Sequence, residues 1–167
     1  MCLCANAQSV LGIRFGLSYS VVKRSLEDRF GEFSVHENKG VLKIYDVEVG
    51  GFHFKYAEFD FQRNSGLSYF NYASFQTFYS ATDIQTARDE RDYLYSLLKD
   101  KYKNDYVEEY INKQGYKCYR FGTDPVDKNK ALGRITLEKS KGKDGKTRLY
   151  LLLTYGPIYY LDKSSDF

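Results

Sequence analysis

The chain has 167 residues, of which 43% are hydrophobic and 28% charged, which excludes a wholly disordered protein and suits one ordinary domain. The net charge of +3 does not indicate a nucleic-acid partner, and no apolar run approaches the ~20 residues that a membrane-spanning helix needs. The 17 Tyr and 12 Phe, with no Trp, favour β-sheet, because aromatic side chains suit its half-buried surfaces.

The opening stretch "MCLCANAQ" resembles the end of an export signal. The small residues of Ala5-Asn6-Ala7 precede Gln8 in the pattern that signal peptidase recognises. We therefore expect residues 1–7 to be the tail of a signal truncated at Met1, and the protein to be periplasmic or secreted. The alternative is a frayed cytoplasmic N-terminus. Cleavage would leave Cys118 as the single cysteine, which excludes an internal disulfide.

The first half of the chain predicts a short strand, a helix and three longer strands. The strand covers Val10–Gly16, and the helix covers Ser18–Phe30, with apolar residues at every fourth position and a closing Gly31. The strands that follow are read from alternating apolar residues. They are "VLKIYDVEV", "FHFKYAEFDFQ" and "LSYFNYASFQTFY".

The second half predicts one long helix followed by four strands. The helix extends over Asp83–Tyr102 and has an apolar stripe that includes Ala87 and Leu94. The strands are "YVEEYI", "YKCYRFG", "LGRITLEK" and "RLYLLLTYG". The order helix, strands, helix, strands predicts an α+β fold in a single domain over residues 8–167. We expect two tandem helix-plus-antiparallel-strand repeats, about 10–80 and 81–160, with helices packed on one face of a largely antiparallel sheet.

The segment "GIRFGLSYSVVKRSLEDRFG", followed by hairpins that carry "GGFHFKYAEFDF", resembles repeats of the beta-lactamase inhibitor protein-like fold. The outer-membrane assembly lipoprotein family opens in a similar way, as do small secreted proteins of Bacteroidetes. The resemblance implies tandem α+β repeats with a broad open sheet face that is used for protein contacts. The disulfides of the inhibitor are absent, and inhibition of a beta-lactamase is not implied.

The aromatic strands give the main candidates for binding. In "FHFKYAEFDF" the apolar residues change parity after Tyr56, so either a bulge switches the phase or both faces carry aromatic side chains. Tyrosines on an open sheet face are typical of protein-binding patches. The candidate binding residues are Tyr56, Tyr69 and Tyr72, and the alternative is that they cover the core and brace cross-strand pairs.

Two patterns resemble catalytic or ligand sites. Glu58 and Asp60 share one strand face and could act as an acid pair on sugars or hold calcium, although paired carboxylates more often mark a polar sheet face. The segment "SKGKDGKT" is close to a phosphate-binding loop, but a strand follows where that motif needs a helix. Asp144-Gly145 is therefore interpreted as a hairpin turn whose lysines are solvated.

We therefore expect a non-enzymatic binding or envelope-scaffold module without metal or cofactor, whose partner is another envelope or secreted protein. We expect no nucleic-acid partner and no membrane span. The alternative is a hydrolase or carbohydrate-binding protein that uses Glu58 and Asp60. The pattern leaves open which sheet face is exposed, and it does not predict the oligomeric state.

Overall fold

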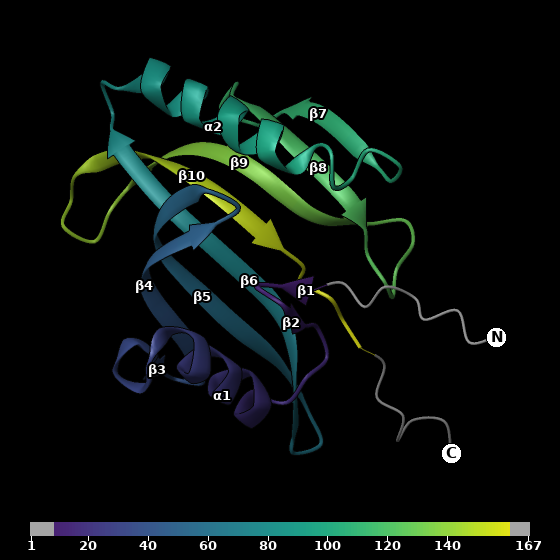
Figure 1. Ribbon diagram of the computed structural model, residues 1–167. Helices are drawn as coiled ribbons and strands as arrows, with labels where there is room; N and C mark the ends of the chain where they lie inside the picture. The colour runs from purple at the N-terminus through teal and green to yellow at the C-terminus, as the bar shows by residue number, and fades with distance from the viewer. Residues whose placement is uncertain (1–8, 161–167) are drawn as a thin grey trace.

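A computed structural model describes residues 9–160 of the chain (Figure 1). It contains two α-helices, α1 (Tyr19–Phe30) and α2 (Ile84–Leu98), and a short 3-10 helix η1 (Glu32–Ser34). The strands are β1 (Ser9–Val10), β2 (Ile13–Arg14), β3 (His36–Asn38), β4 (Val41–Val49), β5 (Phe52–Asn64), β6 (Leu67–Ser80), β7 (Val107–Ile111), β8 (Lys117–Thr123), β9 (Ala131–Lys141) and β10 (Thr147–Tyr155).

Strands β3 to β10 form one antiparallel sheet of eight strands in the order β3-β4-β5-β6-β10-β9-β8-β7. The expected fold class is wrong. The described residues are 49% strand and 20% helical, so the protein is mostly β and not two tandem helix-plus-strand repeats. The physical reason is the central ladder between β6 and β10, which places Phe75 opposite Leu153 and merges distant segments into one sheet. The antiparallel character of the sheet is confirmed.

The bounds of α1 follow from its sequence. Val22 and Leu26 lie one turn apart and are fully buried, so they form the stripe that holds the helix against the sheet. The helix ends at Gly31, whose φ of 93° suits glycine and whose N–H donates to the carbonyl of Glu27 at 2.8 Å. The expected span Ser18–Phe30 therefore agrees to within one residue.

Helix α2 is shorter than expected. It ends at Leu98, and turns follow in which Tyr102 is still buried against Phe121. Burial of Tyr102 therefore does not require it to be helical. The buried stripe of α2 also contains a residue that hydrophobic patterning does not identify, Arg91, whose Nη1 donates to the carbonyl of Lys117 at 3.2 Å.

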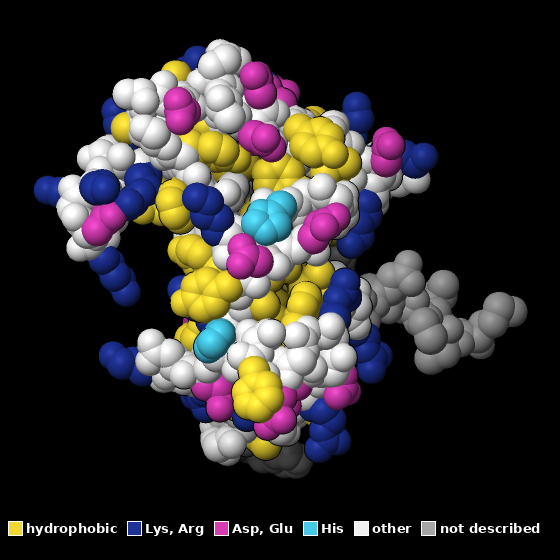
Figure 2. Space-filling model, turned by 60° about the vertical axis from the view of Figure 1, so that its left-hand side comes forward, with side chains coloured by type: hydrophobic (Ala, Val, Ile, Leu, Met, Phe, Trp, Pro, Cys, Tyr) yellow, Lys and Arg dark blue, Asp and Glu magenta, His cyan; other side chains and the backbone are white. Residues whose placement is uncertain are grey.

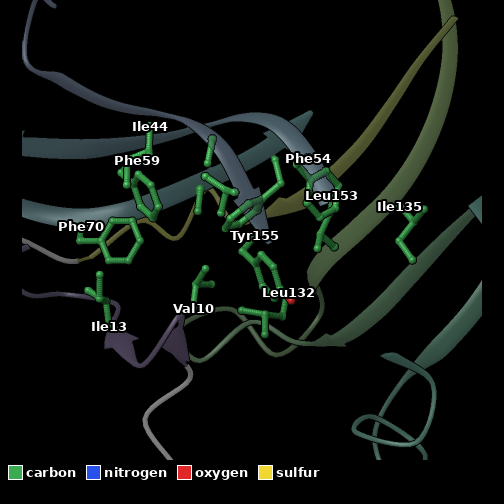
Figure 3. Packing of buried hydrophobic residues seen from close by; sticks show 14 of the residues in the cluster. Val10, Ile13, Ile44, Phe54, Phe59, Phe70, Leu132, Ile135, Leu153 and Tyr155 are labelled. Atoms are coloured by element: carbon green, nitrogen blue, oxygen red, sulfur yellow. The ribbon is translucent and has the colours of Figure 1, made fainter. Parts of the chain in front are cut away.

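The core lies on one face of the sheet. The long strands send alternate apolar side chains into it, and the β1–β2 hairpin adds Val10 and Ile13 (Figure 3). Buried residues of both helices join the same cluster. In Figure 1, α1 lies near one end of the sheet and α2 near the other. The two helices therefore share a core with the sheet, and the opposite face of the sheet is left for other contacts.

The parity change expected near Tyr56 is present. Phe54 and Ala57 are both buried, although a regular strand would point them to opposite faces. Between them Lys55 and Tyr56 both lie outside the core, next to Asp46 on β4, which has a left-handed φ of 55°. The switch lets β5 bury five apolar residues on one face, namely Phe52, Phe54, Ala57, Phe59 and Phe61.

Candidate functional site on the outer face of the sheet

We call the face of the sheet opposite the core the outer face. Cross-strand register and alternation place the following residues on it: Lys43, Tyr45, Tyr56, Glu58, Asp60, Tyr72, Gln76, Glu108, Arg120, Arg134 and Thr154. Tyr56 and Tyr72 of the predicted binding set and both members of the predicted acid pair belong to this face. The sheet thus brings together most of the candidates that the sequence indicated, but it distributes them over different surroundings.

Tyr56 lies in an aromatic cluster with Tyr45 and the cation of Lys43. The Lys43 Nζ is 4.1 Å from the Tyr56 ring centroid and 5.1 Å from that of Tyr45, and it also pairs with Glu58 at 3.6 Å. The Tyr56 hydroxyl donates to Gln76 Oε1. Burial, and then the negative charge of Glu58, raise the pKa of Tyr56, so its phenol stays protonated and remains a hydrogen-bond donor.

Tyr45 is the most accessible member of this cluster, with 53% of its surface exposed. Its ring lies 5.4 Å from the ring of His36 on β3. Figure 2 shows hydrophobic side chains exposed between the two histidines, with acidic and basic groups beside them. The cluster of Lys43, Tyr45 and Tyr56 is therefore an accessible part of the outer face.

Tyr69 does not share these surroundings. Its ring packs 5.9 Å from that of Tyr160, in the last described segment of the chain. That segment is tied to β5 because Gln62 Nε2 donates to the carbonyl of Tyr160 at 3.0 Å and the Tyr160 N–H donates back to Gln62 Oε1 at 2.7 Å. Tyr69 is therefore partly covered from within the chain, and the three predicted tyrosines do not form one patch.

Tyr72 lines a hollow that has a volume of about 910 Å³. Residues of β8 and β9 line it together with residues from the segments 124–130 and 156–159. Its lining includes Tyr72, Tyr106, Tyr159, Glu108, Arg120, Arg134, Lys128, Lys130, Asp124 and Thr154. A smaller pocket of about 370 Å³ shares Tyr72, Pro157 and Tyr159 with it.

The cations of the hollow are unequally neutralised. Arg120 Nη1 lies 3.0 Å from Glu108 Oε2, and its guanidinium stacks 3.7 Å from the Tyr110 ring centroid. The hydrogen bond from Tyr106, followed by that from Arg120, lowers the pKa of Glu108 and keeps it ionised. Arg134 is paired directly opposite Arg120 in the β8–β9 ladder and forms no ion pair with any carboxylate in residues 9–160.

The predicted acid pair is separated by its partners. Glu58 is held by Lys43, whereas Asp60 Oδ1 accepts the N–H of Phe61 at 2.7 Å. Asp60 lines the smaller pocket, and Glu58 lines neither cavity. His53 pairs with Asp46 at 3.6 Å in an exposed position. The arrangement therefore does not place the two carboxylates around one cavity, and it gives no support to the hydrolase alternative.

Sequence reasoning missed Arg120 and Arg134. Each stands between buried residues of its strand, so alternation alone indicates that both belong to a polar sheet face. Their direct pairing needs the register of the β8–β9 hairpin. Residues 124–130 join these strands, and their conformation depends on Asp124, whose Oδ1 accepts the N–H groups of Val126 and Asp127 at 2.8 and 2.9 Å.

Comparisons with protein-family models, with curated proteins and with solved structures found no match to this chain. Within residues 9–160, neither helix combines the length and the apolar character that crossing a bilayer requires. The candidate site is therefore interpreted from its own geometry and chemistry.

Proposed function

We propose that the protein is a non-enzymatic binding module that holds another envelope or secreted protein against the outer face of its sheet. The observation that carries the proposal is the cluster of Lys43, Tyr45 and Tyr56, in which tyrosine rings and a stacked cation are presented on the face opposite both helices. The envelope location of the partner rests on the expected export of the chain, and residues 1–7, which carry that expectation, lie outside the described residues.

The chemistry of this cluster suits a protein contact. Tyrosine offers a large contact area with few rotatable bonds and therefore loses little conformational entropy when it is bound. Lys43 is already held by Glu58 and by the two rings, so ordering it on binding costs less than ordering a free lysine. The partner surface that fits is one of apolar side chains that pack on the exposed ring of Tyr45, because the phenol hydrogen of Tyr56 is already donated to Gln76.

The test combines partner identification with an affinity measurement. A photo-crosslinking amino acid at position 45 should capture a defined envelope or secreted protein, and the same probe at position 93 should not. Tyr93 is a matched control because it is 50% exposed but lies on α2, on the other side of the sheet. With the purified partner, Tyr45→Ala should weaken binding by about 2 kcal/mol, roughly thirtyfold in Kd.

Tyr93→Ala should leave that affinity unchanged. Circular dichroism and thermal unfolding of both variants should match those of the parent protein, because each tyrosine is half exposed. Equal losses of affinity in the two variants, or no loss in Tyr45→Ala, would show that this cluster is not the contact surface.

A further inference from the structure

We propose that the hollow between β8, β9 and residues 124–130 binds an oxyanion, a carboxylate or a phosphate, that a small ligand with a ring-shaped or apolar body carries. Arg120 and Arg134 would hold the oxyanion, and Tyr72 and Tyr159 would flank the body of the ligand. This site is separate from the aromatic cluster of Tyr45 and Tyr56, neither of which lines the hollow. The inference therefore does not depend on the proposed protein contact.

The first argument is the pairing of two like charges. Arg120 and Arg134 are direct cross-strand partners on the same face, a position in which Cβ atoms lie only about 4.5–5.5 Å apart and like charges repel. On the far side of Arg120 stands Glu108, which pairs with it, but on the far side of Arg134 stands the uncharged Thr154. An anion placed between the two guanidinium groups removes this repulsion.

The second argument is the charge balance around the hollow. Four cationic side chains line it and only two acidic ones do. Both acids are already engaged, Glu108 by Arg120 and Asp124 by backbone N–H groups of its own loop. Lys130 pairs with Asp127 at 3.6 Å, whereas Lys128 has no ion pair within the described part of the chain. The hollow therefore has excess positive charge in a concave site, which attracts anions.

The third argument is the shape of the donors. A guanidinium group presents its N–H donors as a planar fork that matches two oxygens of a carboxylate or phosphate. Stacking on Tyr110 and the bond to Glu108 restrain Arg120 before any ligand arrives. Burial raises the pKa of Tyr72, so its hydroxyl is available as a donor. A volume of about 910 Å³ is that of a small-molecule site.

The charge distribution favours a small ligand over a polyanion. Elsewhere on the outer face Lys43 is paired with Glu58 and Arg148 with Asp144, whereas Lys55 lies over the Phe78 ring without an ion pair among the described residues and lines neither cavity. Nucleic acid or an anionic membrane would need cations spread along a surface, because each phosphate it presents is contacted in turn. Here the unpaired cations that line a cavity are gathered in the hollow.

The experiment titrates the full chain with four probes at about 0.15 M ionic strength, where exposed charges are screened beyond about 8 Å. The probes are inorganic phosphate, phenyl phosphate, acetate and benzoate, and binding is followed by calorimetry and by the NMR signals of the arginine Nε–H groups. At least one aromatic probe should bind saturably, shift the signals of Arg120 and Arg134, and bind at least fivefold tighter than its ring-free counterpart. The tighter of phenyl phosphate and benzoate identifies the oxyanion.

Arg134→Gln should weaken binding of that probe at least tenfold. The matched control is Arg88→Gln, on the exposed side of α2, which should leave the affinity unchanged. Thermal unfolding adds a second readout: the probe should raise the Tm of the parent protein and of Arg88→Gln, but not that of Arg134→Gln. The proposal is overturned if no probe binds saturably, or if Arg134→Gln binds as tightly as the parent protein. Equal affinities for the aromatic and ring-free probes would overturn the role of the two tyrosines.

Discussion

The two halves of the sheet bury different side chains. In the half formed by β3 to β6, together with α1, the interior of the central strands is mainly phenylalanine, with Phe54, Phe59, Phe61, Phe70 and Phe75 in mutual ring contact. In the half formed by β7 to β10, together with α2, branched aliphatic residues dominate β9 and β10, namely Leu132, Ile135, Leu137, Leu149, Leu151 and Leu153. The two interiors meet where Phe75 packs edge-on against Tyr155, at a centroid distance of 6.5 Å.

The outer faces of the two halves differ in charge. In the first half the charge of Lys43 has three partners, the carboxylate of Glu58 and the rings of Tyr45 and Tyr56. In the second half Arg134 faces another arginine and has no acidic partner within residues 9–160. One half thus presents a neutralised aromatic surface and the other an electropositive hollow. The two proposed contacts therefore depend on different chemistry of the same sheet face.

The substitutions with the largest expected effect on the free energy of unfolding test whether the two halves form one cooperative unit. Phe75→Ala removes a fully buried ring that contacts Phe54, Phe59 and Tyr155, and should lower the free energy of unfolding by about 3–5 kcal/mol. Leu153→Ala, at the position directly opposite on β10, should cost about 2–5 kcal/mol. Urea unfolding followed by tyrosine fluorescence and by circular dichroism should give one coincident transition for both variants. Two separate transitions would mean that the halves are independent.

A smaller effect tests the packing beneath the hollow. In Gly133→Ala the new Cβ would lie 2.4 Å from Phe121 Cζ and 2.7 Å from the carbonyl oxygen of Thr154. Overpacking of this kind should cost about 1–3 kcal/mol in urea unfolding. Gly142→Ala is the control, because its nearest neighbours are the ends of the flexible Arg148 and Asp144 side chains. A neutral result for Gly133→Ala would contradict the close approach of Phe121 and Thr154 to Gly133.

The second half should also lose stability in acid through Asp92. Burial acts to raise the pKa of Asp92, but hydrogen bonds from Arg91 and Tyr119 outweigh it, and the net pKa lies below the ordinary 3.8. The carboxylate thus stabilises the fold above the unfolded-state pKa, and this contribution is lost as the pH falls through the lowered folded-state pKa.

Asp92→Asn should therefore cost on the order of 1 kcal/mol at pH 7, since the carboxylate is partly exposed and its charge is screened. The difference from the parent protein should shrink as the pH falls through the lowered pKa of Asp92, because the parent carboxyl is then protonated as well. Urea unfolding at a series of pH values measures both quantities. A difference that stays constant while the pH is lowered from 7 into the acid range would exclude the charged hydrogen bonds as its cause.

The smallest effects should have opposite signs in the two halves. Lys43→Gln removes a cation that has attractive partners and should destabilise the protein by about 0.5 kcal/mol. Arg134→Gln removes a cation that faces Arg120 and should stabilise the ligand-free protein by about 0.5 kcal/mol. Paired unfolding curves at low salt measure the contrast, which should shrink in 1 M NaCl. Equal signs for the two substitutions would remove the electrostatic distinction drawn above.

The sequence predicted the features that depend on short segments. The span of α1 follows from Val22, Leu26 and Gly31, and the strands from runs of alternating apolar residues. The fold class could not be predicted in the same way, because the pairing of β6 with β10 is a contact between distant segments that no local pattern specifies. The apolar pattern predicts the end of α2 at Tyr102 instead of Leu98, because Tyr102 is buried although it lies beyond the helix.

The candidate site could likewise be predicted only where it depends on a short segment of the chain. Tyr72 on β6 and Asp60 on β5 each stand out in the pattern of their own strand, and both line a cavity. Arg120 and Arg134 belong to different strands and gain their significance only from their direct pairing across the ladder. Local composition identifies single candidates for a surface, whereas the charge relation between them is a property of register.

The edges of the sheet have a consequence for self-association. An unpaired outer strand is a template on which a second copy can add its own strand. Strand β3 at one edge has only three residues, all exposed. At the other edge, β7 pairs Glu109 with Tyr119, which is itself paired with Ile135. Tyr119 and Ile135 are buried, so Glu109 lies on the core face of the sheet. A strand added beside β7 would bury this carboxylate next to Tyr119, so we expect Glu109 to oppose growth of the sheet into fibrillar aggregates.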